Sequence, residues 1–130
     1  MLKRIIYLII LLVIFSCEKN NNSPNIIFIL TDDLGYGDLS SYGSETIKTT
    51  NIDKLAEDGV KLTSYYAAQP VCSASRAAIL TGAYPNRIGI YNAFGPTSNS
   101  GINHDEYTLA EMLKDNGYKT GIFGKWHLGS

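Results

Sequence analysis

The sequence predicts an α/β fold in which a mainly parallel sheet is flanked by helices. Three observations support this prediction: apolar runs of strand length, helical segments between them, and turn residues at the boundaries. Strands that alternate with helices are typical of parallel sheets, because each helix returns the chain to the same edge of the sheet. We expect the fold to be incomplete at the C-terminus, since the chain stops at Ser130, after a strand, with no closing helix.

Three segments are predicted to be strands. Residues 25–31 read NIIFILT, and an unbroken apolar run of this kind favours a strand buried on both faces. Residues 60–66 and 118–123 each follow a predicted helix and carry apolar or aromatic side chains. The chain shows no internal repeat, so these strands belong to one sheet in one layered domain.

Three helices are predicted, and capping residues mark their termini. They cover residues 50–59, then Ser73 or Ala74 to Thr81, then 108–116. Thr50 is expected to cap the first helix and Gly59 to end it. In TLAE, Thr108 and Glu111 form a capping box at the start of the third. Residues 83–106 are rich in proline and glycine and are expected to be a loop.

Composition and charge exclude several classes of protein. Hydrophobic residues make up 45% and charged residues 18% of the 130 residues, which is typical of a globular chain and not of a disordered one. There are 11 basic and 12 acidic residues, and the basic ones are scattered. We therefore expect no nucleic-acid partner.

The N-terminal segment differs from the rest of the chain. A basic start, an apolar run over residues 5–15 and a small residue at Ser16 predict a signal peptide over residues 1–17. Its last four residues, IFSC, resemble a bacterial lipobox, in which Cys17 becomes lipidated; a buried N-terminal strand or helix is the alternative. Residues 18–24 are expected to be a polar tether. The protein is then an exported lipoprotein, periplasmic or at the cell surface, with membrane contact only through a lipid anchor at Cys17.

Cys72 is the second of the two cysteines, and lipidation of Cys17 leaves it without a disulfide partner. It lies at a predicted helix start, where the helix dipole favours a thiolate, and Arg76 follows one turn later. Two interpretations remain open from these residues alone. Cys72 is a reactive nucleophile, or it is a small buried side chain beside a surface arginine.

Two further clusters follow predicted strands, where sites gather in open α/β sheets. Asp32 and Asp33 are adjacent carboxylates, which suit a hard divalent cation but also an ordinary solvated turn. Lys125 and His127 lie two residues apart, so an extended segment directs both to one side. They suit an anionic substrate and a proton transfer, although a polar strand end is the plainer interpretation.

Taken together, the clusters closely resemble one family, the formylglycine-dependent sulfatases of the alkaline-phosphatase-like superfamily. The resemblance rests on NIIFILTDDLGYGDLSSYG, CSASRAAILTG and TLAEMLKDNGYKTGIFGKWHLG. Their order and wide spacing make the combination highly specific. By this resemblance residues 25–130 are the N-terminal part of a sulfatase catalytic domain with an alkaline-phosphatase-like fold.

The resemblance implies that a maturation enzyme oxidises Cys72 to formylglycine. That enzyme reads a Cys-x-Pro/Ala-x-Arg pattern, and Cys72, Ala74 and Arg76 occupy its fixed positions. Hydrated formylglycine is a geminal diol: one hydroxyl attacks the sulfur of the ester and the alcohol leaves. The other hydroxyl then loses its proton, and the diol carbon returns to the aldehyde and expels sulfate. A plain serine would stall as a stable sulfate ester.

The remaining site residues follow from the same resemblance. Asp32 and Asp33, with the residue formed from Cys72, bind calcium or another divalent cation. Arg76 and Lys125 hold the diol and neutralise its charge, and His127 takes the proton in the release step. Lys125 and His127 also contact the substrate, which is a sulfated small molecule or glycan.

Two alternatives to a sulfatase remain. A related phosphatase or phosphonate hydrolase shares the metal site, although the Cys-x-Ala-x-Arg pattern argues against a serine or threonine nucleophile. A non-catalytic surface lipoprotein is the other alternative, and the intact set of charged residues argues against it. Relatives continue far beyond GKWHLG and add metal and sulfate ligands there, so we expect residues 1–130 alone to be inactive.

Overall fold

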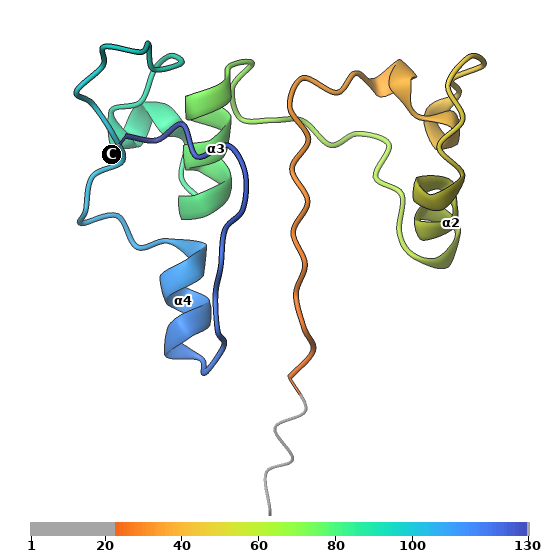
Figure 1. The fold of residues 1–130 in the computed structure, drawn as a ribbon. Helices are drawn as coiled ribbons and strands as arrows, with labels where there is room; N and C mark the ends of the chain where they lie inside the picture. Colours follow the sequence, from red (N-terminus) through yellow and green to blue (C-terminus); the bar gives the residue numbers. More distant parts are fainter. Residues whose placement is uncertain (1–22, 130) are drawn as a thin grey trace, which may run out of the picture. The chain divides into compact units, whose positions relative to one another are not determined.

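The computed structural model describes residues 23–129, and the chain divides at Thr31 and Asp32 into two units. In the first unit, residues 23–31 form an extended segment without helix or strand pairing (Figure 1). The predicted signal peptide, Cys17 and most of the tether lie outside the described residues. Within the described range, every helix is too short or too polar to cross a membrane.

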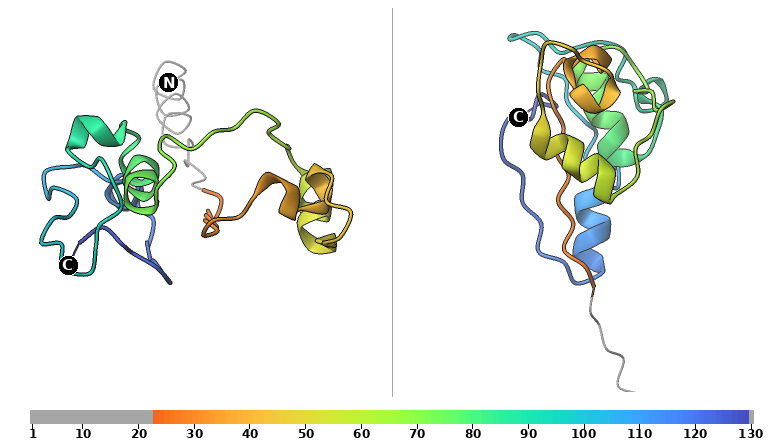
Figure 2. Two further views of the ribbon diagram at one scale, coloured as in Figure 1. Left: turned by 90° about the horizontal axis from the view of Figure 1, so that it is seen from above. Right: turned by 90° about the vertical axis from the view of Figure 1, so that its right-hand side faces the viewer.

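The second unit contains short helices joined by long irregular segments (Figures 1 and 2). Its α-helices are α2 (Thr50–Asp58), α3 (Cys72–Thr81) and α4 (Leu109–Asp115). Its 3-10 helices are η1 (Tyr36–Asp38), η2 (Ser40–Tyr42) and η3 (Pro85–Ile88). The three predicted α-helices are therefore confirmed, and the predicted loop 83–106 contains the η3 turn.

Two of the predicted helix starts need correction. The prediction that Thr50 caps the first helix is wrong, because Thr50 is already helical and Thr49 is the N-cap. The Thr49 carbonyl accepts from the Asp53 N–H at 2.8 Å, which is the first hydrogen bond of the helix. The second helix starts at Cys72, one or two residues earlier than the predicted start at Ser73 or Ala74, with Val71 as its extended N-cap.

Asp53 of α2 ties this helix to η2. Its carboxylate accepts from the Ser40 hydroxyl at 2.5 Å, the Ser41 N–H at 2.8 Å and the Thr49 hydroxyl at 2.9 Å. These bonds lower the pKa of Asp53, with Ser40 the main cause, although desolvation of the carboxylate opposes the shift. Asp53 therefore stays ionised at neutral pH and holds the two helices together.

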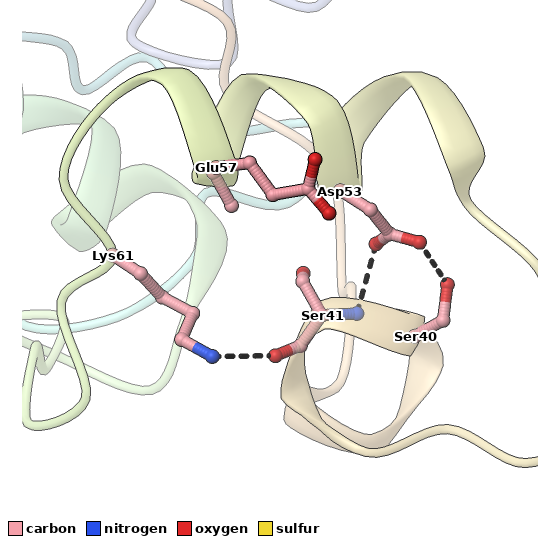
Figure 3. A pocket seen from close by; sticks show the side chains of 6 residues that line it. Ser40, Ser41, Asp53, Glu57 and Lys61 are labelled. Atoms are coloured by element: carbon pink, nitrogen blue, oxygen red, sulfur yellow. Dashed lines mark hydrogen bonds between the residues drawn. The ribbon is translucent and has the colours of Figure 1, made fainter.

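The same residues line an open pocket of about 290 Å³ between η2 and α2 (Figure 3). The Lys61 ammonium closes one side by donating to the Ser41 carbonyl at 2.8 Å. Both oxygens of Asp53 already accept hydrogen bonds from η2 and its flanks. We therefore interpret this pocket as the packing interface between η2 and α2.

The described core is small and centres on α3. Its fully buried hydrophobic members are Ala74, Ala77, Ile90 and Leu128, and Val71, Leu80, Ile88, Phe94 and Ile102 pack around them. Helix α3 also contacts η3 and α4 (Figure 2). Gly82 ends α3 with a φ of +67°, a conformation that favours glycine. The core thus fixes the first turn of α3, where Cys72 lies, against residues 88–102 and Leu128.

The capping box predicted for the third helix is confirmed. The Thr108 hydroxyl accepts from the Glu111 N–H at 3.3 Å, and the Glu111 carboxylate accepts from the Thr108 N–H at 2.8 Å. Both partners satisfy donors that the first turn of a helix leaves free. Asn116, the last predicted residue, is the C-cap of α4.

No strand is present within residues 23–129, so the predicted parallel sheet is not observed there. The three predicted strands are extended and exposed: Ile27 is 84% exposed, Val60 86% and Phe123 98%. A strand exists only by pairing, since its N–H and C=O groups bond to a neighbour and not within the segment. These segments have the apolar composition of buried strands but lack a paired neighbour within the described range.

Candidate active site

Residues from three places in the sequence meet around the start of α3. They are the turn at Asp32 and Asp33, the first turn of α3 with Cys72 and Arg76, and the segment 124–129. Hydrogen bonds join Asp32 to Arg76 and to Lys125, across 44 and 93 positions of the chain. The sequence-predicted site residues other than His127 therefore form one charged cluster.

Asp32 lies between the two cationic side chains of the cluster. One oxygen accepts from the Lys125 ammonium at 2.9 Å and the other from the Arg76 guanidinium at 3.3 Å. The bond to Lys125 is the main reason that the pKa of Asp32 is lowered, and it raises the pKa of Lys125. Asp32 and Lys125 are thus charged at neutral pH, and the cluster places two cationic side chains beside its carboxylates.

Asp33 is one of only two described non-glycine residues with positive φ, at +53°. Aspartate tolerates this left-handed conformation better than most residues. In extended backbone the side chains of Asp32 and Asp33 would point to opposite faces, and the left-handed turn removes that alternation. As a result, one ligand atom each from Asp32, Asp33 and Cys72 lie within 4.8 Å of one another.

This set of side chains suits a hard divalent cation. Two carboxylates supply oxygen ligands, and their proximity is favourable only when positive charge lies between or beside them. Cys72 supplies a sulfur atom here, which is a poor ligand for such a cation, whereas an oxygen in its place would complete a hard set. The donor chemistry therefore fits a calcium-type ion once the side chain of residue 72 carries oxygen.

Arg76 lies one turn after Cys72 on α3, and its side chain is only 13% exposed. One nitrogen donates to the Lys125 carbonyl at 2.7 Å, so Arg76 fixes the backbone of Lys125 as well as the Asp32 carboxylate. The Arg76 Nε is buried and meets no hydrogen-bond acceptor within residues 23–129. A free, buried N–H on a fixed guanidinium is suited to an anionic oxygen.

His127 is the other described non-glycine residue with positive φ, at +57°. This conformation breaks the extended alternation from which Lys125 and His127 were predicted to share a side. Instead, each is placed by its own contact: Lys125 by Asp32, and His127 by a 2.7 Å hydrogen bond from Nε2 to the Phe94 carbonyl. The other ring nitrogen, Nδ1, is buried with no partner among the described side chains.

Sequence reasoning missed Phe94 and Ser73. Ser73 is fully buried, and its hydroxyl accepts from the Phe94 N–H at 3.0 Å. Phe94 contributes through its peptide, and a backbone carbonyl gives no signal in the sequence. Ser73 stands at a variable position of the Cys-x-Ala-x-Arg pattern, so the motif did not single it out either.

Comparison with known proteins identifies relatives of this chain. The family model described as Sulfatase matches residues 24–130. Human steryl-sulfatase is 48% identical over 128 residues, which cover 92% of this chain and 22% of the relative. Arylsulfatase A of Bos taurus is 52% identical over 107 residues, which cover 82% of this chain and 21% of the relative. The chain thus spans about a fifth of the length of these relatives.

Solved structures agree with the sequence comparison. The crystal structure of Ps i-CgsB superposes with a TM-score of 0.79 at 46% identity, covering 82% of this chain and 24% of that one. The same protein in complex with k-i-k-neocarrahexaose gives 0.73 at 44% identity, covering 76% of this chain and 22% of that one. The fold is therefore the α/β fold of these structures. The match of the Sulfatase model to nearly all of the described residues shows that this chain belongs to the sulfatase family.

Proposed function

We propose that this protein hydrolyses sulfate esters, with Cys72 converted to formylglycine as the nucleophile. One observation carries the proposal. Cys72 is the first residue of α3, and its sulfur lies within 4.8 Å of ligand atoms of Asp32 and Asp33, while Arg76 and Lys125 pair with Asp32. Carboxylates for a cation and fixed cations for an anion are what transfer of a sulfuryl group requires. Membership of the sulfatase family supports the same activity.

A divalent cation, with calcium the favoured ion, would be held by Asp32, Asp33 and the oxidised residue 72. When bound, it supplies positive charge that offsets the sulfate and favours ionisation of a hydroxyl group. The lowered pKa of Asp32 supports this role, because the carboxylate is ionised before any cation arrives. The oxidation of Cys72 would also replace its soft sulfur by oxygen ligands, which calcium prefers.

Arg76 and Lys125 bind and orient the anionic group. Arg76 is nearly buried and held at two of its nitrogens, so it loses little freedom when its Nε meets an oxygen. Lys125 is more exposed, and its ammonium is held at 2.9 Å from Asp32. His127 takes the proton from the second hydroxyl of the diol in the step that expels sulfate.

The substrate class that we propose is a sulfated glycan or small molecule. A solved structure that is 44% identical to this chain holds an oligosaccharide, k-i-k-neocarrahexaose. The Arg76 guanidinium and the Lys125 ammonium of the cluster are suited to an anionic group such as a sulfate ester.

The proposal is tested on the full-length gene product that contains these residues, since residues 1–130 alone are expected to be inactive, made in cells that also express a formylglycine-generating enzyme. Mass spectrometry of the peptide with Cys72 should detect formylglycine, and the protein should hydrolyse an aryl sulfate faster than the matched aryl phosphate. Cys72→Ala should abolish the activity and serves as the control. Unmodified thiol throughout, or preference for the phosphate, would contradict the proposal.

We also propose that segments 25–31, 60–66 and 118–123 are strands of the parallel sheet predicted from the sequence. Their apolar, exposed side chains, such as Ile27 and Phe123, support this. Hydrogen exchange of the active protein tests it, because strands within a sheet protect their amides and unpaired segments do not.

Export and lipidation remain proposals that rest on the sequence of residues 1–17. Metabolic labelling with a radioactive fatty acid should mark the wild-type protein and not a Cys17→Ala variant. Equal labelling of both would contradict an anchor at Cys17.

A further inference from the structure

We propose that Ser73 is a positioning residue that fixes the orientation and the tautomer of His127 through the peptide of Phe94. The inference rests on the proposed function, since it concerns how His127 is prepared to accept a proton. It assigns a role to a residue that neither binds the cation nor touches the reacting group.

The first link joins α3 to the loop at Phe94. Ser73 is 0% exposed and directly follows Cys72 in the first turn of α3. Its hydroxyl accepts from the Phe94 N–H at 3.0 Å. This part-buried bond gives the Phe94 N–H its acceptor and so holds the Phe94 peptide in one orientation.

The second link joins the same peptide to His127. The Phe94 carbonyl lies 2.7 Å from Nε2 of His127. A carbonyl oxygen only accepts, so Nε2 must carry the hydrogen and donate it. In the neutral ring, Nδ1 then holds the free lone pair, and Nδ1 is the buried nitrogen that meets no partner within the described range. The contact therefore selects the nitrogen that can act as a base.

The end of the loop is attached to the residues that follow His127. The Ile102 N–H donates to the Leu128 carbonyl at 3.0 Å, and Leu128 is 2% exposed. Gly101 and Gly129 pass so closely that a Cβ on Gly129 would lie 2.7 Å from the Gly101 Cα. Residues 94–102 are thus fixed at both ends, and the Phe94 carbonyl has little freedom to follow a displaced imidazole.

These contacts form one path from the nucleophile to the base. Ser73 is covalently joined to Cys72, its hydroxyl holds the Phe94 N–H, and the Phe94 carbonyl holds His127. Removal of the Ser73 hydroxyl frees the Phe94 peptide to turn, which weakens the hold on Nε2. Because reacting groups need near-ideal alignment, a small displacement of the ring lowers the rate of the proton transfer.

The test compares Ser73→Ala with the wild-type protein, both carrying measured amounts of formylglycine. We expect kcat per modified site to fall about tenfold, part of the 10²–10⁴ that a general base contributes. KM should stay within about twofold, since Arg76 and Lys125 are untouched. Ser73→Thr keeps a hydroxyl and should recover most of the lost kcat.

One variant serves as a matched control. Ser75→Ala removes a hydroxyl from the other variable position of the same motif, and that hydroxyl bonds the Gln69 carbonyl instead of Phe94. This variant should retain kcat within about twofold, because it removes no link of the path.

The outcomes separate this inference from the proposed function. Full-length wild-type protein that carries formylglycine but hydrolyses no sulfate ester contradicts the proposed function. Active wild-type protein with an unaffected Ser73→Ala variant, or an equal loss in Ser75→Ala, overturns only the role of Ser73. A crystal structure of Ser73→Ala decides independently of activity, since an unchanged contact between His127 Nε2 and the Phe94 carbonyl would also overturn it.

Discussion

Asp32 has two roles that depend on the same negative charge. It holds Lys125 and Arg76 in place, and we propose that it also binds the divalent cation. Because the pKa of Asp32 is lowered, chiefly by Lys125, the carboxylate stays ionised well into the acidic range. Substitution of this one residue should therefore disturb both the cation and the two cationic side chains.

We predict that Asp32→Asn lowers the affinity for calcium at least about tenfold, because calcium affinity follows the charge of the ligand set. Calorimetric titration of the metal-free protein measures it. Asp58→Asn is the matched control, since Asp58 also pairs with a lysine, Lys54 at 3.0 Å, but lies on an exposed helix face. Equal affinities for Asp32→Asn and wild type would contradict a cation at this carboxylate.

Most of what the sequence could predict about the site came from the chemical types of its residues. Asp32, Asp33 and Cys72 were predicted to act together, and their ligand atoms lie within 4.8 Å of one another. The predicted arrangement of Lys125 and His127 relied on extended backbone, and the left-handed φ of His127 removed that basis. Backbone partners such as the Phe94 carbonyl depend on the path of a loop, which no local pattern encodes.

At the scale of elements, helices were predictable and strands were not observed. Helices α2, α3 and α4 satisfy most of their hydrogen bonds within the segment, so local signals such as the capping box at Thr108 suffice. Strands form their hydrogen bonds with neighbouring strands, and residues 25–31, 60–66 and 118–123 have no paired strand in the described range. The sequence therefore predicted where the helices lie, whereas for the strands it indicated only an apolar composition.

We predict that Thr108→Ala destabilises the first turn of α4 by about 1 kcal/mol, which is typical for the loss of an N-cap. Amides of residues 109–115 should then exchange about fivefold faster, measured by hydrogen exchange with mass spectrometry. Thr97→Ala, in an exposed turn, is the control and should leave α4 unchanged.

The pH dependence provides a second check on this cap. Hydrogen bonds from Thr108 lower the pKa of Glu111, so their contribution is present above the ordinary pKa of glutamate and is lost as the pH falls through the lowered value. The difference between wild type and Thr108→Ala should therefore shrink in acid. A difference that stays constant across this range would contradict the reciprocal cap.

At the scale of the whole molecule, little apolar surface is buried. Four hydrophobic residues are fully buried within the described range, whereas Ile27, Val60, Tyr66 and Phe123 are each more than 80% exposed. Hydrophobic burial is the main favourable term in folding. The described residues therefore contain local helices and one small core, with much apolar surface left to cover.

We predict that a polypeptide of these 130 residues binds the dye ANS strongly and unfolds without a cooperative calorimetric transition. Exposed apolar surface with retained helices produces this behaviour. A sharp transition with a size-typical enthalpy, and no dye binding, would contradict the small extent of the core.

The left-handed backbone at Asp33 and His127 has a consequence for protein engineering. Each conformation costs on the order of 1 kcal/mol in a non-glycine residue, and glycine would adopt it freely. A screen for thermostability would favour glycine at both positions, yet glycine removes a carboxylate from the proposed cation site at Asp33 and the proposed base at His127. A gain in stability is therefore coupled to a loss of activity at these two positions. Stabilising substitutions should be sought at other positions.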